Sequence, residues 1–211
     1  MKNKSSKKIA VISGGTGYLG SAIAHQLVEN GFEVVLISKT KGVDITNPKA
    51  VEKLAEKVKN KFGTITALIH ASSAPLIRQP VLTGSLKDFE SQFSVNVLGA
   101  FNLFKSFCPL IIPGGAIVGI TSQAIEKNDY FPSGSYLPSK FALKGLLKVL
   151  SHELKDRSIR VYEIAPAFMP GGLNQDLPEV VKKFIQAKSR PEEITTPEEV
   201  AKLITKLINA F

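Results

Sequence analysis

The chain has 211 residues, of which 44% are hydrophobic and 21% are charged, and its net charge is +9 at pH 7. This length and composition predict a single globular domain over residues 1–211, and they exclude a fibrous repeat and a disordered chain. A single cysteine, Cys108, excludes an internal disulfide and a cysteine-based metal site, and we expect it in the core.

The positive charge is spread over the chain, apart from four lysines within residues 1–8. Only four of the 27 basic residues are arginines, whereas proteins that read bases and phosphates favour the arginine fork. The charge therefore predicts a solvated surface and no nucleic-acid partner. Residues 1–7 are expected to form a flexible basic N-terminus. No apolar run is long enough to cross a bilayer, and no signal-peptide cleavage pattern follows the lysines, so we expect a cytoplasmic protein without a membrane partner.

Strand-like apolar runs alternate with helical segments along most of the chain. Strands are predicted at residues 8–13, 32–38, 65–72, 114–122 and 159–166, and helices at 18–30, 48–62, 85–111, 136–155, 177–189 and 196–211. Because the strands read as continuous apolar runs, they need cover on both faces. The predicted fold is therefore α/β, a doubly wound parallel sheet flanked by helices on both faces.

The glycine-rich stretch SGGTGYLG, residues 13–20, lies between the first predicted strand and the first predicted helix. Backbone N–H groups and the helix dipole can hold a pyrophosphate at such a junction. The missing side chains of Gly14 and Gly17 would let backbone and phosphate approach, and Gly20 would let helix and strand pack closely. A plain glycine-rich turn is the alternative, and the strand–turn–helix context favours a dinucleotide site.

The residues after the second strand bear on the choice of dinucleotide. An NAD site normally offers a carboxylate there, whereas an NADP site offers positive charge to the 2′-phosphate. This chain has Ser38, Lys39, Thr40 and Lys41, which favours NADP(H) over NAD(H); lysines that only decorate a loop are the alternative. Asp44, the first acid after the strand, lies too far along the chain to be assigned to the ribose.

Tyr136 and Lys140 are spaced i,i+4 and are expected on one face of a helix. The ammonium would favour phenolate and lower the pKa of Tyr136 towards neutrality, where a proton donor works best. Ser122, at the end of the fourth strand, offers a hydroxyl to a carbonyl oxygen. Asn96 lies in a buried helix, where a satisfied core amide is the alternative to a functional role; a surface Tyr–Lys pair is likewise the alternative to a catalytic one.

The ordered motifs SGGTGYLG, DIT, LIHAS, VNVLGAF, IVGITS, YLPSK and IAPAF together resemble the short-chain dehydrogenase/reductase family. The resemblance implies a Rossmann fold of about six strands and hydride transfer between the nicotinamide and a carbonyl carbon. It implies Tyr136 as general acid/base, Lys140 as its pKa-lowering partner and ribose ligand, Ser122 as orienter of the carbonyl, and Asn96 in a water-mediated proton relay. The cofactor-binding residues it implies are Gly14, Thr16, Gly17, Tyr18, Leu19, Gly20, Ser38, Lys39, Asp44, Ile45, Ala71, Ser72, Tyr136, Lys140, Pro166 and Ala167.

The chain departs from the family pattern at several places. HASS at residues 70–73 replaces an Asn-Asn-Ala-Gly run, and Pro166-Ala167 replaces a Pro-Gly pair. The segment between the second strand and Asp44 is too short for the helix that the family usually has there. The chain also stops before a final strand that often helps to form tetramers. A homodimer through the helices around Asn96 and Tyr136 stays open, and a tetramer is not expected.

Three histidines and one amphipathic segment complete the candidates. His25, His70 and His152 have no metal-ligand spacing, so no metal is predicted, and His70 is expected as a polar wall of the cofactor site. Residues 176–190 are expected to form an amphipathic helix beside the active site, as a substrate lid. We predict an NADP(H)-dependent reductase of a small-molecule carbonyl, or dehydrogenase of its alcohol. A catalytically weak NADP-binding sensor or interaction protein on the same fold is the alternative.

Overall fold

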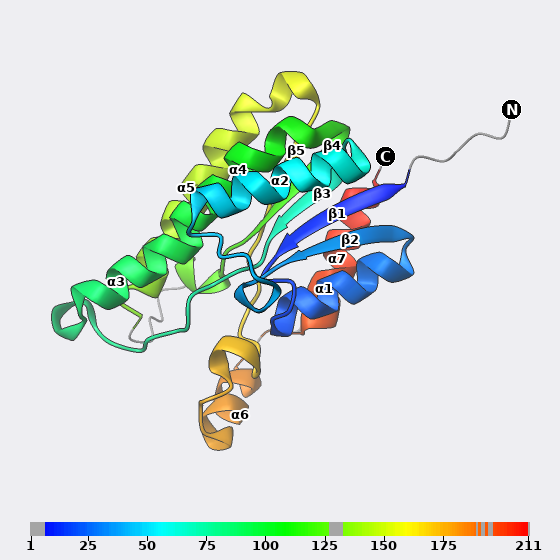
Figure 1. The fold of residues 1–211 in the computed structure, drawn as a ribbon. Coiled ribbons are helices and arrows are strands. Elements are labelled where there is room, and N and C mark those ends of the chain that lie inside the picture. Colours follow the sequence, from blue (N-terminus) through cyan, green and yellow to red (C-terminus); the bar gives the residue numbers. More distant parts are fainter. Residues whose placement is uncertain (1–6, 127–132, 189, 191–192, 194–195, 211) are drawn as a thin grey trace, which may run out of the picture.

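The computed structural model describes residues 7–126, 133–188, 190, 193 and 196–210 (Figure 1). Its centre is a parallel sheet of five strands in the order β2-β1-β3-β4-β5. The strands are β1 (Lys8–Ser13), β2 (Phe32–Ile37), β3 (Ile65–His70), β4 (Ile111–Ile120) and β5 (Arg160–Ile164). The doubly wound parallel sheet predicted from the sequence is thus confirmed, with the Rossmann-like crossover on either side of β1.

Two layers of helices cover the sheet (Figure 1). Helices α1 (Tyr18–Glu29) and α7 (Pro197–Asn209) lie on one face, and α2 (Pro48–Phe62), α4 (Gly99–Phe107) and α5 (Tyr136–Glu153) lie on the other. Helix α3 (Leu86–Phe93) continues through a π-helical turn, η3 (Ser94–Leu98), into α4. Helix α6 (Glu179–Ala187) stands away from the sheet at the end where the strands finish.

The period-2 alternation of strand side chains divides the core into two clusters. In β1, Ile9 and Val11 pack with α2, α4 and α5, while Ala10 and Ile12 pack with α1 and α7. All four side chains are buried. This is why the strands read as unbroken apolar runs: both faces of the sheet are covered.

The number of strands differs from the expected six. Between β2 and α2 the chain has only residues 38–47, which form a short 3₁₀ turn, η1 (Lys39–Lys41), that ends at Gly42 with φ of +79°. Ten residues cannot hold both a helix and a strand that returns parallel to β2. β2 is therefore an edge strand of this sheet.

Three of the seven α-helices in the described residues, α2, α3 and α7, begin at a side-chain cap. Asn47 accepts a hydrogen bond from the Ala50 N–H at the start of α2, and Thr196 and Glu199 form a capping box at α7. Helix α1 is among those without one, because its N-cap is Gly17 and no side chain caps it. Its first N–H groups are thus left to the site described below.

The expected flexible N-terminus falls largely on residues 1–6, which lie outside the described residues. Lys7, the last residue of that expectation, is described and its Nζ lies 3.2 Å from Glu33 Oε2 on β2. No helix in the described part of the chain is both long and apolar enough to span a bilayer.

Candidate active site

A large cleft lies where the sheet changes its winding direction. The chain leaves β1 towards β2 on one side and returns to β3 on the other, so α1, which follows β1, and α4, which follows β3, lie on opposite faces of the sheet. Ligands of open α/β sheets bind at this kind of switch point. A cleft of about 1170 Å³ opens here, bounded by the glycine turn, the ends of β2, β3 and β4, the start of α5 and residues 166–177.

The glycine turn shapes the cleft through two close approaches. Gly14 has φ of +72°, and a Cβ there would lie 2.7 Å from the Ser72 backbone nitrogen. A Cβ at Gly20 would lie 2.1 Å from the Gly14 carbonyl oxygen, so Gly20 has the close-packing role that the sequence predicted. The missing side chain of Gly14 accommodates the loop after β3, and Gly14 also lines the cleft.

The start of α1 has the features of an anion site. Gly17 is the N-cap, no side chain caps the helix, and no acidic residue lies in its first turn. A Cβ at Gly17 would meet only the Gly14 carbonyl oxygen within 4 Å, at 3.2 Å. The uncapped N–H groups and the positive end of the helix therefore face the cleft, and this geometry fits a dinucleotide pyrophosphate.

Hydroxyl groups and one lysine lie at the end of β2. Thr40 Oγ1 lies 2.9 Å from Ser38 Oγ and 3.4 Å from Thr16 Oγ1. Lys39 Nζ lies 3.0 Å from Asp44 Oδ2, so Asp44 is closer to this corner than its sequence position suggested. Partial burial raises the pKa of Asp44, but hydrogen bonds from the Thr46 backbone, Lys39 and the Thr46 hydroxyl lower it below the ordinary value. Lys41 is exposed and does not line the cleft.

Tyr136, Lys140 and Ser122 meet on the opposite wall of the cleft. Lys140 Nζ donates a hydrogen bond to the Ile120 carbonyl at 2.9 Å and lies 5.6 Å from the centre of the Tyr136 ring. Both side chains are buried, at the start of α5. Ser122 follows β4; its Oγ accepts a hydrogen bond from the Ala124 N–H at 3.3 Å, and it lines the cleft beside Tyr136. The sequence-predicted catalytic trio is thus brought together by the end of β4 and the first turn of α5.

The pKa values at this wall are governed by burial. Burial raises the pKa of Tyr136, and the nearby Ser122 hydroxyl only opposes that rise. The expected lowering of the Tyr136 pKa by Lys140 is therefore wrong for this structure, because the loss of phenolate solvation on burial is the largest influence on that pKa. Burial also lowers the pKa of Lys140, to about 8.

Asn96 lies behind the trio and does not line the cleft. Its Oδ1 accepts from the Ala74 N–H at 3.1 Å, and its Nδ2 donates to Gln92 Oε1 at 2.9 Å and Ser139 Oγ at 2.8 Å. Ser139 in turn donates to the Tyr136 carbonyl at 2.7 Å. The amide matches the alternative of a satisfied core group. It joins the loop after β3 to the π-helical turn and to α5.

His70 is not a wall of the cleft, contrary to the expectation from sequence. It is fully buried at the end of β3, with Nδ1 2.9 Å from Ser13 Oγ and its ring edge-on to Phe104. Its Nε2 has no hydrogen-bond partner among the described residues. Burial, followed by the charge of Lys140, lowers the pKa of His70 to about 3, so the ring is neutral.

All sixteen cofactor positions implied by the family resemblance line the cleft. The sequence missed the loops on the other side: Leu76, Arg78, Met169, Gly171, Gly172, Leu173, Asn174 and Gln175. The amphipathic segment expected beside the site does line it, through Leu177, Phe184, Ile185 and Lys188. Arg78 carries no sequence signal, since it lies in a loop without a motif.

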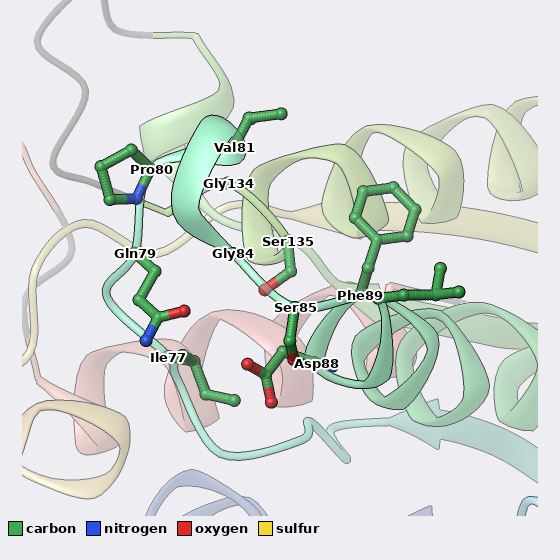
Figure 2. A pocket seen from close by; sticks show the side chains of 11 residues that line it. Ile77, Gln79, Pro80, Val81, Gly84, Ser85, Asp88, Phe89, Gly134 and Ser135 are labelled. Carbon is green, nitrogen blue, oxygen red and sulfur yellow. Dashed lines mark hydrogen bonds between the residues drawn. The ribbon is translucent and has the colours of Figure 1, made fainter.

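A second, smaller hollow of about 200 Å³ lies between the loop around Gln79, the start of α3 and Gly134–Ser135 (Figure 2). The Gly134 N–H donates to the Gln79 carbonyl at 2.9 Å, which supports the segment before Tyr136. Asp88 is the one titratable side chain among the described residues lining it. No group of His, Cys, Asp and Glu in the described residues has a metal-binding arrangement.

Comparisons with known proteins identify the family of the chain. A family model described as enoyl-(acyl carrier protein) reductase matches residues 38–210. A 3-oxoacyl-[acyl-carrier-protein] reductase, FabG, of Buchnera aphidicola is 30% identical over 98% of this chain and 91% of its own length.

Solved structures share the fold over nearly the whole chain. A short-chain dehydrogenase/reductase from Serratia marcescens superimposes with a TM-score of 0.85 at 22% identity, covering 95% of this chain and 90% of that one. An NAD⁺-bound xylitol dehydrogenase gives 0.86 at 23% identity, covering 98% and 94%. Taken with the family match and the ordered motifs, these likenesses mean that the chain belongs to the short-chain dehydrogenase/reductase family of oxidoreductases.

Proposed function

We propose that this protein is an NADP(H)-dependent oxidoreductase that reduces a small carbonyl compound or oxidises the corresponding alcohol. The observation that carries the proposal is the convergence of Tyr136, Ser122 and Lys140 on one wall of a cleft whose opposite wall is the uncapped start of α1. A protein that only binds a nucleotide needs the wall at the start of α1 but not the wall that carries Tyr136, Ser122 and Lys140.

The residues of the glycine turn and of the ends of β2 and β3 would hold the dinucleotide. The start of α1 would take the pyrophosphate, and Asp44 and Ile45 lie beside Ser38 and Lys39 at the adenosine side. Lys140 and the segment at Pro166 and Ala167 would hold the nicotinamide end. When bound, the nicotinamide supplies or accepts the hydride.

Tyr136 would exchange the proton on the substrate oxygen. Because burial keeps its pKa raised, the phenol is protonated at neutral pH and can donate to the oxygen of a carbonyl undergoing reduction. Ser122 would hold the same oxygen through its hydroxyl. Lys140, with a pKa of about 8, is mostly an ammonium at pH 7 and stabilises negative charge that develops on the tyrosine oxygen.

The end of β2 favours NADP(H). The positions nearest the cleft are Thr16, Ser38, Lys39 and Thr40, which offer hydroxyl donors and a positive charge to a phosphate. The nearest carboxylate, Asp44, is paired with Lys39. When a phosphate binds, Lys39 must either leave Asp44 or contact both the carboxylate and the phosphate. Cofactor choice should therefore depend most on Lys39.

The cofactor preference is testable by titration. Wild type should bind NADPH more tightly than NADH, and Lys39→Ala should lose about tenfold in NADPH affinity, equivalent to one charge-assisted contact, with little change for NADH. Lys41→Ala is the matched control, since Lys41 does not line the cleft. Equal binding of the two cofactors by wild type would overturn the preference.

The assignment of Tyr136 is tested by turnover. Tyr136→Phe should reduce carbonyl compounds at least about a hundredfold more slowly than wild type while NADPH binding is kept, because only the proton donor is removed. Tyr162→Phe, on β5 and outside the cleft, is the control and should retain activity. Unchanged turnover in Tyr136→Phe would remove the proposed acid.

A further inference from the structure

Arg78 joins two loops that come from different strands of the sheet. It lies in the segment after β3, and its Nη1 donates to both carboxylate oxygens of Asp176, at 3.1 and 2.8 Å. Its Nη2 donates to the Leu173 carbonyl at 3.2 Å and to Asn174 Oδ1 at 2.8 Å. The Arg78 side chain is 19% exposed and that of Asp176 is 65% exposed, so the guanidinium lies mostly beneath the loop that it binds.

The other end of that loop rests on the cofactor side of the cleft. A Cβ at Gly171 would lie 2.6 Å from the Tyr18 ring, and one at Gly172 would lie 3.0 Å from it. Tyr18 is the first residue of α1, next to the glycine turn. Residues 171–176 therefore contact the dinucleotide turn at one end and Arg78 at the other, and we call them the strap.

The strap has few other attachments within the described residues. Its backbone N–H groups at Asn174 and Gln175 bond inside the strap, and Asn174 Nδ2 donates to the Met169 carbonyl. Lys182 of α6 donates to the Gln175 carbonyl at 3.1 Å, which joins the strap to α6. Among these polar contacts, those of Arg78 connect the strap to the loop that follows β3.

The strap and its flanks supply much of the apolar wall of the cleft beyond the catalytic trio. Met169, Leu173, Leu177 and Phe184 line it, together with Leu76 from the loop that carries Arg78. A wall of this composition suits a carbonyl compound with an apolar substituent, because burial of such a group is what these side chains can stabilise. The position of the wall depends on the position of the strap.

We infer that Arg78 is a positioning residue that fixes the strap, and with it the apolar substrate wall, through a fork of four hydrogen bonds. This inference rests on the proposed carbonyl oxidoreductase function. The planar guanidinium suits the task, since it can meet a carboxylate in a bidentate manner and still donate to two further acceptors. A lysine at this position has a single charged nitrogen and cannot reproduce the fork.

The test compares substrate and cofactor parameters in Arg78→Lys, Arg78→Ala and Asp176→Asn. KM for an apolar carbonyl compound should rise about tenfold or more in both Arg78 variants and by less in Asp176→Asn, while the Kd for NADPH changes by less than about twofold. Hydrogen exchange of residues 169–177 should accelerate in the same order. Arg157→Ala is the matched control, because Arg157 donates to the Ile111 carbonyl outside the cleft.

Each outcome bears on the inference in a definite way. If wild type turns over carbonyl compounds and the Arg78 and Asp176 variants keep both its KM and its exchange rates, the inference is wrong and the proposed function stands. If wild type has no turnover, the proposed function fails, and the exchange of residues 169–177 still decides whether Arg78 fixes the strap. Because Asp176 is exposed, Asp176→Asn should fold even if Arg78→Ala does not, and unchanged exchange in that variant counts against the inference.

Discussion

At the scale of single residues, burial rather than mutual interaction determines the pKa values of Tyr136 and Lys140 at the candidate site. Burial raises the pKa of Tyr136 and lowers that of Lys140 to about 8. The i,i+4 spacing correctly placed the two on one helix face, but spacing carries no information on solvation. Whether a Tyr–Lys pair yields phenolate or phenol depends on how deeply α5 is buried, which the pair itself does not specify.

The lowered pKa of Lys140 predicts the pH dependence of carbonyl reduction. The ammonium is populated below pH 8 and lost above it, so kcat/KM should fall with pH above about 8. Lys140→Arg, if active, should move that fall to higher pH, because a guanidinium stays protonated. Rate measurements between pH 6 and 10 check this, and a profile that is flat to pH 9.5 in wild type would contradict it.

The buried His70 predicts a loss of stability in acid. Its pKa is about 3 in the folded protein against about 6.5 in an unfolded chain, so the unfolded state binds more protons between these values. The unfolding free energy should therefore fall as pH drops below about 6.5, by up to roughly 1.4 kcal/mol per pH unit from this group. His70→Asn should have a shallower fall in urea titrations at pH 7 and pH 5.

A control separates His70 from the other histidines. His25 is largely exposed, so His25→Asn should keep the pH dependence of wild type. If wild type and His70→Asn lose the same free energy between pH 7 and pH 5, the buried ring is not the source of the acid sensitivity.

At the scale of elements, the junction of β1 and α1 and the π-helical turn before α4 define the site. Gly20 allows α1 to start against the glycine turn, and Asn96 in the π-helical turn connects α3, α5 and the loop after β3. π-Helical turns are rare and often occur at functional sites. Here the turn places an amide behind the catalytic wall, where it is fully hydrogen-bonded.

Gly20→Ala should damage the junction of β1 and α1. The added Cβ would lie 2.1 Å from the Gly14 carbonyl oxygen, so α1 or the turn must shift. We expect a loss of about 1–3 kcal/mol in unfolding free energy and a weaker affinity for NADPH. Ser21→Ala, at the exposed neighbouring position, should stay within about 0.5 kcal/mol of wild type. Wild-type cofactor affinity in Gly20→Ala would refute the close-packing role.

At the scale of the whole molecule, the sequence predicted the fold better than the site. The apolar runs and helical periodicity gave all five observed strands in order, and the glycine turn marked the cofactor wall. The expected sixth strand came from the family pattern, and residues 38–47 are too few to form it. The substrate wall was missed because Arg78, Leu173 and Asn174 lie in irregular loops, where tertiary contacts rather than periodicity decide which side chains face the cleft.

An apolar surface on the α4–α5 face bears on assembly. Leu98 and Phe101, on the η3–α4 segment, and Phe141 and Val149, on α5, are exposed. On α5, Gly145 lies between the last two with no atom near its missing side chain. The sequence left open a homodimer through the helices around Asn96 and Tyr136, and these exposed apolar side chains lie on those helices.

Substitution on that surface tests the homodimer. Phe101→Asp and Phe141→Asp should each convert a dimeric wild type to monomer in sedimentation velocity, because a charge would be buried without a partner. Val28→Asp, at an exposed apolar position on the other face of the sheet, should leave the mass unchanged. A monomeric wild type at micromolar concentration would contradict the proposed dimer.

The central claim is that hydride passes between a nicotinamide cofactor and a carbonyl carbon in this cleft. The most direct measurement is deuterium transfer from NADPH labelled at the nicotinamide C4 to apolar carbonyl compounds, analysed by mass spectrometry of the product. The account predicts that the alcohol product of the wild-type reaction carries deuterium at the former carbonyl carbon, and that Tyr136→Phe forms little of it. Tight NADPH binding without deuterium transfer to any carbonyl in the panel would contradict the account and leave a nucleotide-binding sensor as the better description.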